Sequence, residues 1–337
     1  MKVVVIYDID LSWNSFEIST ARCSARELCE ALQEEGIEAV TEELNNAALG
    51  EVLDRYNPDQ ALLFNLCETL PGIPESESSV IRTIQERGFS YTGNMADVID
   101  LSYDKLQVKE VLASYGIITP YGEILSPAEA EGWNLFPAIV KPSREHCSLT
   151  IREDSVVYDT KSLKKQIALV NNELKQPALV EDFIDGREFH VSVWGNGRPE
   201  MLPPAEMDFS YFEEAHDRLC TYDSKFIPGS RHYEMIETQL PAPLDEVELR
   251  SIEEVVIQAW RGLGCRDYAR FDLRLRDRHF YLLDFNPNND ISIDTSFAMA
   301  AELHGYSYGA LAKKIVSMAA NRHPAFVNAS WEEDCFY

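Results

Sequence analysis

Short apolar runs alternate with amphipathic segments through the first hundred residues of the chain. The apolar runs are VVVIYDI, IEAVTEEL and ALLFNL, and the segments over residues 15–35, 47–56 and 78–87 repeat their apolar residues every three or four positions. Strands that alternate with helix-length segments are typical of parallel sheets with right-handed crossovers. The pattern predicts an open, Rossmann-like α/β sheet. Its first strand is not followed by the Gly-x-Gly-x-x-Gly fingerprint of a dinucleotide site.

The rest of the chain is richer in predicted strands. The runs FPAIVKP and PALVEDF enclose a predicted helix over residues 161–173, and REFHVSVWG begins a further run of strands. Helices are predicted over residues 105–115 and 243–263 and in the last part of the chain, to about residue 321. We therefore expect three domains, which cover residues 1–98, 99–183 and 184–337.

Residues 208–231 form a long segment without a regular apolar pattern. It is rich in Tyr, Phe, Asp and Gly, and it is longer than an ordinary connection between two elements. Long irregular segments in compact domains are often active-site lids. We expect this segment to close over a site. It contains Lys225, which could add positive charge to a metal–phosphate site. An ordinary loop lysine is the simpler alternative.

Two adjacent strands, DYARFDLRL and HFYLLDFN, are predicted to form a hairpin that turns at residues 276–278. Residue 270 would then pair near 284, and residue 272 near 282. Because side chains alternate along strands, one face would carry Arg270, Asp272, Asp284 and Asn286, and the other Phe271, Leu273, Leu283 and Phe285. Oxygen ligands on neighbouring strands suit Mg²⁺. A surface salt-bridge cluster is the plain alternative, and a register slip of one residue would separate the four polar residues.

Lysines and glutamates elsewhere could complete a site for a phosphorylated ligand. Lys105 stands at a predicted helix start, where a solvated lysine is the more usual case. Lys141 ends an apolar strand, and an ammonium group there needs an anion. Glu181 closes a predicted strand and Glu188 opens the next. A carboxylate at either position could accept hydrogen bonds from an amino group or from ribose hydroxyls, although acids are common in linkers.

Composition and charge narrow the class of protein. Hydrophobic residues make up 45% of the chain, and the formal net charge is −27 with a pI near 4.6. This balance disfavours nucleic acid and anionic membrane surfaces as partners. No apolar run is long enough to span a bilayer. The seven cysteines include no Cys-x-x-Cys pair, which favours free thiols in a reducing cytosol and disfavours a zinc site.

Four segments together resemble the ATP-grasp superfamily, and most closely the D-alanine–D-alanine ligase family. They are FPAIVKPSRE, LVEDFIDGREFHV, YARFDLRL and YLLDFNPNNDIS, and SYTGNMADVIDLSYDK adds a fifth match. The resemblance covers nearly the whole chain. It implies a Rossmann-like pre-ATP-grasp domain followed by a two-part ATP-grasp α+β fold. It also implies ATP and Mg²⁺ or Mn²⁺ as cofactors, small-molecule carboxylate and amine substrates, and a homodimer.

The resemblance also implies roles for individual residues. Those assigned to the nucleotide are Lys105, Lys141 and Lys225 on the phosphates, Glu181, Phe183 and Ile184 at the adenine, and Glu188 at the ribose. Those assigned to the metal are Asp272, Asp284 and Asn286, and those assigned to catalysis are Arg270, Lys225 and Ser148. The family has Glu where Asp284 stands, so this carboxylate reaches about one methylene less.

The substrate side departs from the family in several places. His146-Cys147-Ser148 stands where the family has Gly-Ser-Ser, and the missing glycine restricts the backbone. The residues at positions that the resemblance assigns to the substrate are Glu17, Ser19, Cys147, Phe226 and Asp290. Counting back from Gly36 places Ser19 at an ammonium-binding Glu of the family, whereas a two-residue shift would offer Glu17. Phe226 replaces a Tyr, and CETLPGIPESESS replaces a glycine-rich segment.

We expect an ATP-dependent carboxylate–amine ligase that uses an acyl phosphate and a substrate other than D-alanine. No nucleophilic side chain is required for this chemistry. Two alternatives stand beside it. One is a true D-alanine–D-alanine ligase of cell-wall synthesis. The other is a nucleotide-binding module without turnover, which the altered phosphate loop and Asp284 would favour.

Overall fold

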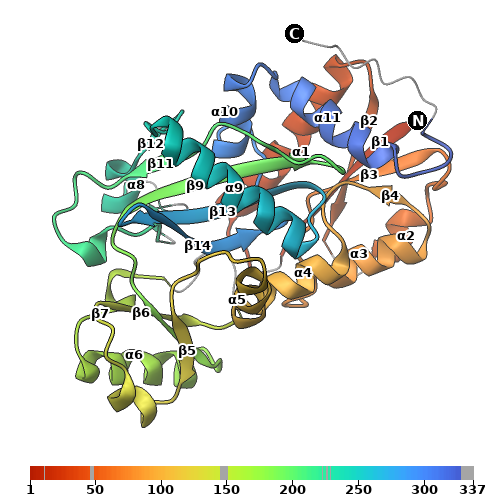
Figure 1. The fold of residues 1–337 in the computed structure, drawn as a ribbon. Coiled ribbons are helices and arrows are strands. Elements are labelled where there is room, and N and C mark those ends of the chain that lie inside the picture. Colours follow the sequence, from red (N-terminus) through yellow and green to blue (C-terminus); the bar gives the residue numbers. More distant parts are fainter. Residues whose placement is uncertain are drawn as a thin grey trace.

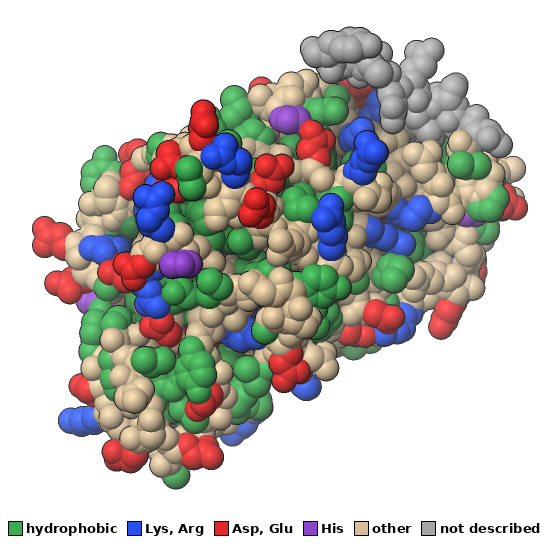
Figure 2. All heavy atoms as spheres, viewed as in Figure 1, with side chains coloured by type: hydrophobic (Ala, Val, Ile, Leu, Met, Phe, Trp, Pro, Cys, Tyr) green, Lys and Arg blue, Asp and Glu red, His purple; other side chains and the backbone are tan. Residues whose placement is uncertain are grey.

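Three sheets, each with its own helices, make up the protein (Figure 1). The computed structural model describes residues 1–10, 12–45, 49–144, 151–221, 223–224, 227 and 229–327. Charged side chains of both signs are interspersed over the face shown in Figure 2. Within the described residues, no helix combines the length and the apolar character needed to cross a membrane.

The first sheet is parallel, as the alternating pattern predicted. Its strands are β1 (Lys2–Asp8), β2 (Glu38–Leu44), β3 (Ala61–Asn65) and β4 (Ser90–Tyr91), in the order β2-β1-β3-β4. Its helices are α1 (Ser15–Glu34), α2 (Leu49–Leu53), α3 (Glu77–Glu86) and α4 (Ala96–Tyr103). In a parallel sheet the carboxyl ends of the strands lie at one edge, where ligand sites of open α/β sheets form.

The second sheet is antiparallel and forms the lobe at the lower left of Figure 1. Helix α5 (Lys105–Ser114) leads to it. Its strands run in the order β5 (Gly122–Leu125), β8 (Ala178–Asp182), β6 (Ala138–Pro142) and β7 (Val156–Val157), and α6 (Thr160–Glu173) covers it. Two short 3₁₀ helices, η1 (Glu129–Gly132) and η2 (Glu153–Ser155), lie in its connections.

The third sheet has six strands and carries the predicted hairpin. Its strands are β9 (Arg187–Gly195), β10 (Glu200–Met201), β11 (Ala205–Asp208), β12 (Glu237–Gln239), β13 (Asp267–Arg276) and β14 (His279–Asn286). Its helical elements are η3 (Ala215–Asp217), α8 (Arg231–Met235) and α9 (Glu246–Leu263). Apolar side chains of α9, including Val256 and Trp260, share a core with Phe271 of β13.

The hairpin forms as predicted, but its register differs by two residues. Asp272 lies opposite Asp284, and Arg270 opposite Asn286. The turn takes only two residues, Asp277 and Arg278, both with positive φ (52° and 62°), and this moves the pairing by one residue. A β-bulge between residues 272 and 273 moves it by one more. The bulge is what brings the two aspartates face to face, because the turn alone would place Leu283 opposite Asp272.

The same bulge changes which residues lie on the apolar face of the hairpin. Leu282, not Leu283, is buried in the core with Phe271, Leu273 and Phe285. Leu283 is the inserted residue, so it leaves the regular alternation and stays half-exposed. A simple period of two along the sequence therefore assigned the wrong leucine to the core.

The last helices return to the first sheet. Helices α10 (Ser296–Leu303) and α11 (Tyr308–Ala320) share a core with β1, β3 and α1, and Figure 1 shows α11 beside β1 and α1. The three sheets follow the order of the proposed domains. The boundaries at residues 98 and 183 stay a prediction, and the shared core shows that the C-terminal helices pack with the first sheet.

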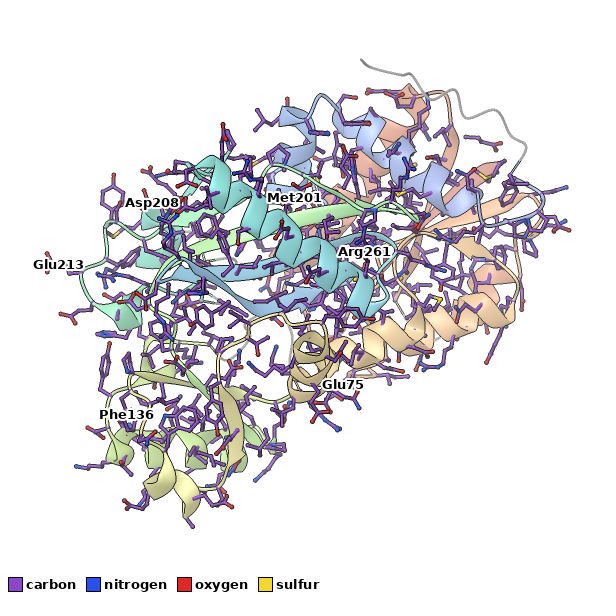
Figure 3. The ribbon with its side chains drawn as sticks, in the orientation of Figure 1. Glu75, Phe136, Met201, Asp208, Glu213 and Arg261 are labelled. Atoms are coloured by element: carbon purple, nitrogen blue, oxygen red, sulfur yellow. The ribbon has the colours of Figure 1, made fainter. Side chains whose placement is uncertain are left out.

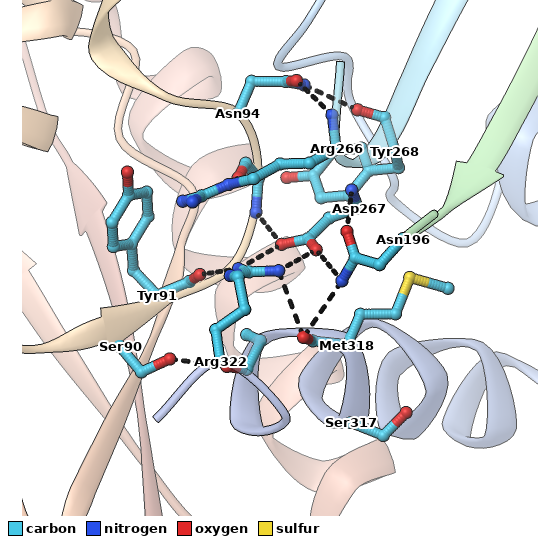
Figure 4. Close-up of polar contacts among 12 residues, drawn as sticks. Ser90, Tyr91, Asn94, Asn196, Arg266, Asp267, Tyr268, Ser317, Met318 and Arg322 are labelled. Atoms are coloured by element: carbon cyan, nitrogen blue, oxygen red, sulfur yellow. Dashed lines mark hydrogen bonds and ion pairs between the residues drawn. The ribbon is translucent and has the colours of Figure 1, made fainter. Parts of the chain in front are cut away.

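A buried carboxylate, Asp267, joins the first sheet, the third sheet and α11 (Figure 4). Asp267 is fully buried. One of its oxygens accepts from the Gly93 backbone N–H at 2.8 Å and from Arg322 Nη2 at 2.8 Å. The other accepts from Asn196 Nδ2 at 3.0 Å. Arg322 Nη2 also donates to the Tyr91 carbonyl at 2.7 Å. This network holds the first sheet, the third sheet and α11 together.

Replacing Asp267 with Ala is expected to lower the free energy of unfolding by about 3 kcal/mol, because the Gly93 N–H and the Asn196 amide lose their buried acceptor and Arg322 loses its ion-pair partner. Urea unfolding followed by circular dichroism measures the change. The matched control is Asp59→Ala, whose side chain is 76% exposed and which should shift stability by less than about 0.5 kcal/mol. Equal losses in the two variants would contradict the role given to Asp267.

Candidate active site

The paired strands β13 and β14 bring the four predicted polar residues of the hairpin together. Arg270 Nε and Nη2 contact the two oxygens of Asp272 at 2.7 and 3.0 Å. Asn286 Nδ2 donates to Asp272 Oδ2 at 3.3 Å. Lys105, at the start of α5, reaches Asp284 Oδ1 at 3.2 Å. The predicted phosphate lysine therefore lies against a predicted metal ligand.

The donor atoms at this edge fit a hard divalent cation. Two carboxylates face each other across the hairpin, and the Asn286 amide can present its oxygen when its two ends exchange. Mg²⁺ is commonly held by one or two carboxylates together with substrate phosphates. Arg270 pairs with Asp272, and Lys105 pairs with Asp284. Both carboxylates therefore already attract positive charge.

A buried ion triad lies beside this edge. Glu181 of β8 is 1% exposed and pairs with Lys141 of β6 and with Lys109 of α5, whose Nζ lies 2.5 Å from Glu181 Oε1. Burial opposes the charge on Lys141, but the charges of Glu181 and Asp284 prevail and raise its pKa. Burial and the charge of Lys141 lower the pKa of Lys109 despite Glu181. Lys105, Lys109, Glu181 and Asp284 line one pocket.

Lys109 is a site residue that the sequence reading missed. Lys105 and Lys109 are four residues apart on one helix, so they lie on the same face. That spacing was a usable signal, because Lys105 was already assigned to the phosphates. The Glu181 carboxylate is committed to two lysines, and their charges lower its pKa although burial would raise it.

Glu188 also has a buried cationic partner that the sequence reading missed. Arg274 Nε donates to Glu188 Oε2 at 2.8 Å, and Arg274 Nη1 donates to the Ile184 carbonyl at 2.8 Å. The Arg274 guanidinium lies over the Phe183 ring, 4.9 Å from its centroid. Although burial opposes the charge, Arg274 holds the pKa of Glu188 well below its usual range. Alternation along β13 places Arg274 on the same face as Arg270 and Asp272, which was the signal available.

Two further groups of side chains offer three metal-ligand atoms within 4.8 Å of one another among the described residues. They are Glu188, His190 and Cys220, and Glu153, Asp217 and His232. In the first group, the charge of Glu188 is already balanced by Arg274. In the second, Asp217 pairs with Arg231 at 2.7 Å. Each group thus contains a carboxylate that already pairs with an arginine.

The described part of the predicted lid contacts the nucleotide-side residues. Arg218 Nη1 donates to both oxygens of Asp185, at 3.0 and 3.1 Å, and the Arg218 carbonyl accepts from Arg274. Leu219 packs with Phe183 and Val156. Figure 3 labels Asp208 and Glu213 at the start of this segment. These contacts place the segment over the candidate nucleotide side.

Only some of the residues predicted to bind the substrate lie among the residues that the structure describes. Glu17 Oε2 accepts from the Asn14 backbone N–H at 2.7 Å and so closes the capping box of α1. Ser19 is exposed on the same helix. Asp290 accepts from the Ser292 backbone and hydroxyl at 2.8 and 2.6 Å. His146, Cys147, Ser148, Lys225 and Phe226 lie outside the described residues.

Comparisons with known proteins find similar sequences and a similar fold. A family model described as "D-ala D-ala ligase C-terminus" matches residues 114–317. A D-alanine–D-alanine ligase of Bordetella petrii is 31% identical, with 69% of each chain covered. An uncharacterized protein, y4sG, of Sinorhizobium fredii is 29% identical, over 87% of this chain and 86% of that one. The solved D-alanine–D-alanine ligase of Bacillus anthracis with ATP is 20% identical, with a TM-score of 0.73 and coverage of 95% and 97%.

Proposed function

Because the chain belongs to the D-alanine–D-alanine ligase family of ATP-grasp ligases, we propose that it uses ATP to join a carboxylate to an amine, with at least one substrate other than D-alanine. The ATP-grasp fold and the ADP-forming class follow from the family. The observation that carries the proposed chemistry is the meeting of Arg270, Asp272, Asp284 and Lys105 at one edge. Members of this family use ATP with a divalent metal.

The reaction divides into two transfers. The substrate carboxylate attacks the γ-phosphorus of ATP, so that an acyl phosphate forms and ADP leaves. The amine then attacks the acyl carbon, loses a proton, and displaces phosphate. A divalent metal bound by Asp272, Asp284 and Asn286 would offset charge on the transferring phosphoryl group. No protein nucleophile takes part.

Each cation of the site has a proposed task in these steps. Lys105 and Lys141 orient the phosphates, because both ammonium groups lie at the metal edge and Lys141 keeps its charge there. Arg270, fixed by two contacts to Asp272, stabilises the oxyanion that forms when the amine attacks. Glu188 is proposed to hold the ribose, with Arg274 fixing the position of its carboxylate. Phe183 and Ile184 are proposed to line the adenine site.

Several residues support a substrate other than D-alanine. At the positions where the family resemblance expects a hydrogen-bonded trio stand Cys147 and Phe226, together with Ser19 or Glu17. Cys is a weak donor, and Phe has no hydroxyl. The Glu17 carboxylate is used in the capping box of its own helix. Sites built around polar contacts discriminate strongly when those contacts change.

The curated relatives favour a second candidate function, which is D-alanine–D-alanine ligation itself. Relatives named D-alanine–D-alanine ligase are 26–31% identical to this chain. The two candidates share the nucleotide chemistry and differ only in the amino-acid side. A homodimer and a cytoplasmic location stay predictions of the sequence.

Hydroxylamine is expected to intercept the acyl phosphate. With ATP, Mg²⁺, a carboxylate substrate and hydroxylamine in excess as the acceptor, the enzyme should form a hydroxamate together with an equal amount of ADP. A panel of amino acids and small peptides serves as the source of carboxylates, and the iron(III) complex of the hydroxamate reports the product. ADP formation without any hydroxamate, across substrates that are turned over with amines, would contradict an acyl-phosphate pathway.

A further inference from the structure

One group of metal-ligating side chains contains none of the residues assigned to the active site. Its members are Glu153 of η2, Asp217 of η3 and His232 of α8. η2 lies in the connections of the second sheet and packs against η3, which belongs with α8 to the third sheet. One ligand atom from each of the three residues lies within 4.8 Å of the other two. The fold therefore brings together possible ligands from both sheets.

The His232 ring is buried and fixed in the orientation of a metal-binding imidazole. His232 is 5% exposed, and its ring stacks on Phe212 with 4.9 Å between the centroids and 17° between the planes. Its Nε2 lies 2.8 Å from the Asp217 carbonyl oxygen. Because a carbonyl only accepts, Nε2 carries the proton, and in the neutral ring Nδ1 carries the lone pair. Metal-binding histidines usually donate their other N–H to such a partner.

Nδ1 of His232 faces Glu153 without forming a hydrogen bond to it. The distance from Nδ1 to Glu153 Oε1 is 3.9 Å, which is beyond the length of a hydrogen bond. Two ligands of one tetrahedral zinc ion, each about 2.1 Å from the metal, stand about 3.4 Å apart. The Glu153 side chain is 53% exposed, so it can move the small remaining distance without disturbing the core.

Asp217 can supply the third ligand atom while it stays paired with its arginine. Arg231 Nη1 donates to Asp217 Oδ2 at 2.7 Å, which leaves Oδ1 as the atom for a metal. Oδ1 lies 3.5 Å from His216 Nε2, so a second imidazole is within reach of the same carboxylate. Asp217 itself is 6% exposed, and its position is therefore set by the packing around it.

One imidazole and two carboxylates suit zinc better than magnesium. Mg²⁺ requires an octahedron of oxygen ligands and keeps several waters, whereas imidazole is a preferred ligand of zinc and the other late first-row metals. With water in the fourth position, the three side chains complete a tetrahedral zinc site. The lack of Cys-x-x-Cys pairs disfavours a zinc site built from cysteines, and this group contains no cysteine.

We propose that Glu153, Asp217 and His232 form a binding site for Zn²⁺, separate from the Mg²⁺ site proposed at the hairpin. The ion joins η2, in the connections of the second sheet, to η3 and α8 of the third sheet. It binds the folded protein through ligands from three separate segments, so it stabilises that state. The site does not depend on the proposed ligase reaction.

Calorimetric titration with ZnCl₂, without nucleotide, tests the site. Glu153→Ala removes one ligand, and we expect it to weaken zinc binding at least about tenfold. His232→Gln keeps an N–H that can donate to the Asp217 carbonyl but lacks Nδ1, so it should weaken binding to a similar extent. The matched control is Asp154→Ala, the exposed acid next to Glu153 in η2, which should bind Zn²⁺ as the native protein does. Zinc binding that is absent from the native protein, or equal in all of these proteins, would overturn the proposal.

A further variant separates this site from the carboxylates of the hairpin, which can also attract Zn²⁺. Asp272→Asn removes a proposed Mg²⁺ ligand and leaves η2, η3 and α8 unchanged. The zinc binding that Glu153→Ala weakens should persist in Asp272→Asn, and an excess of MgCl₂ should not displace it. Zinc binding that is lost in Asp272→Asn but unchanged in Glu153→Ala would assign the ion to the hairpin and overturn the inference.

Thermal unfolding provides a second readout that does not use the heat of binding. Zn²⁺ should raise the Tm of the native protein and of Asp154→Ala, because it binds only the folded state. It should leave the Tm of Glu153→Ala nearly unchanged. Because Glu153 is half-exposed, this variant should fold even where His232→Gln does not, so Glu153→Ala alone decides the outcome. An equal rise in Tm for Glu153→Ala and the native protein would contradict the proposed site.

Discussion

Replacing Asp272 with Asn is expected to lower kcat/KM for ligation at least about a hundredfold while the fold survives. The carboxylate has two tasks in the account. It is a proposed metal ligand, and it fixes Arg270 through contacts at 2.7 and 3.0 Å. Asn keeps the shape but loses the charge on which both tasks depend. ADP formation at several Mg²⁺ concentrations measures the effect, and the variant should need more Mg²⁺ than the native enzyme.

The matched control for Asp272 lies in the same hairpin. Asp277 is exposed in the two-residue turn and has a positive φ of 52°, which Asn tolerates well. Asp277→Asn should therefore keep native turnover, native Mg²⁺ dependence and native stability. Native turnover in Asp272→Asn as well would show that the hairpin face is a structural salt-bridge cluster.

Replacing Lys141 with Met is expected to cost a similar factor of about a hundred or more in kcat/KM. Its ammonium group pairs with Glu181, which lines the pocket together with Lys105, and is proposed to orient the phosphates. Met fills a similar volume without charge, so phosphate positioning is lost. The fold should survive because Lys109 still pairs with Glu181 at 2.5 Å.

Two measurements make the Lys141 result specific. A fluorescent ATP analogue should bind more weakly to Lys141→Met, whereas an exposed lysine on α6, Lys165, can be changed to Met without effect. Circular dichroism should show native secondary structure in both. A Lys141→Met protein that binds nucleotide and turns over normally would remove Lys141 from the site.

The sequence predicted the layout of the chain because that layout follows from local patterns. The alternation of strands and helices predicted the parallel first sheet, and the four polar residues of the hairpin lie together as expected. The register was wrong because the turn length and the bulge at residues 272–273 depend on how β13 pairs with β9 and β14 together. Pattern along a single strand carries no information about that pairing.

The two site residues that were not predicted from the sequence were missed for a different reason. Arg274 and Lys109 act as partners of buried acids, and neither belongs to a short motif. Their signals were positional, in the alternation along β13 and the four-residue spacing along α5.

The most direct test of the account compares phosphate release with D-alanine alone against a panel of carboxylate and amine pairs, with the products identified by mass. The panel includes D- and L-amino acids, small peptides and diamines, each at millimolar concentration with ATP and Mg²⁺. The account predicts that at least one pair is ligated faster than D-alanine alone, with one ADP formed for each new amide bond. D-alanyl-D-alanine as the fastest product, ahead of every other pair, would contradict the claim that this enzyme has a different substrate.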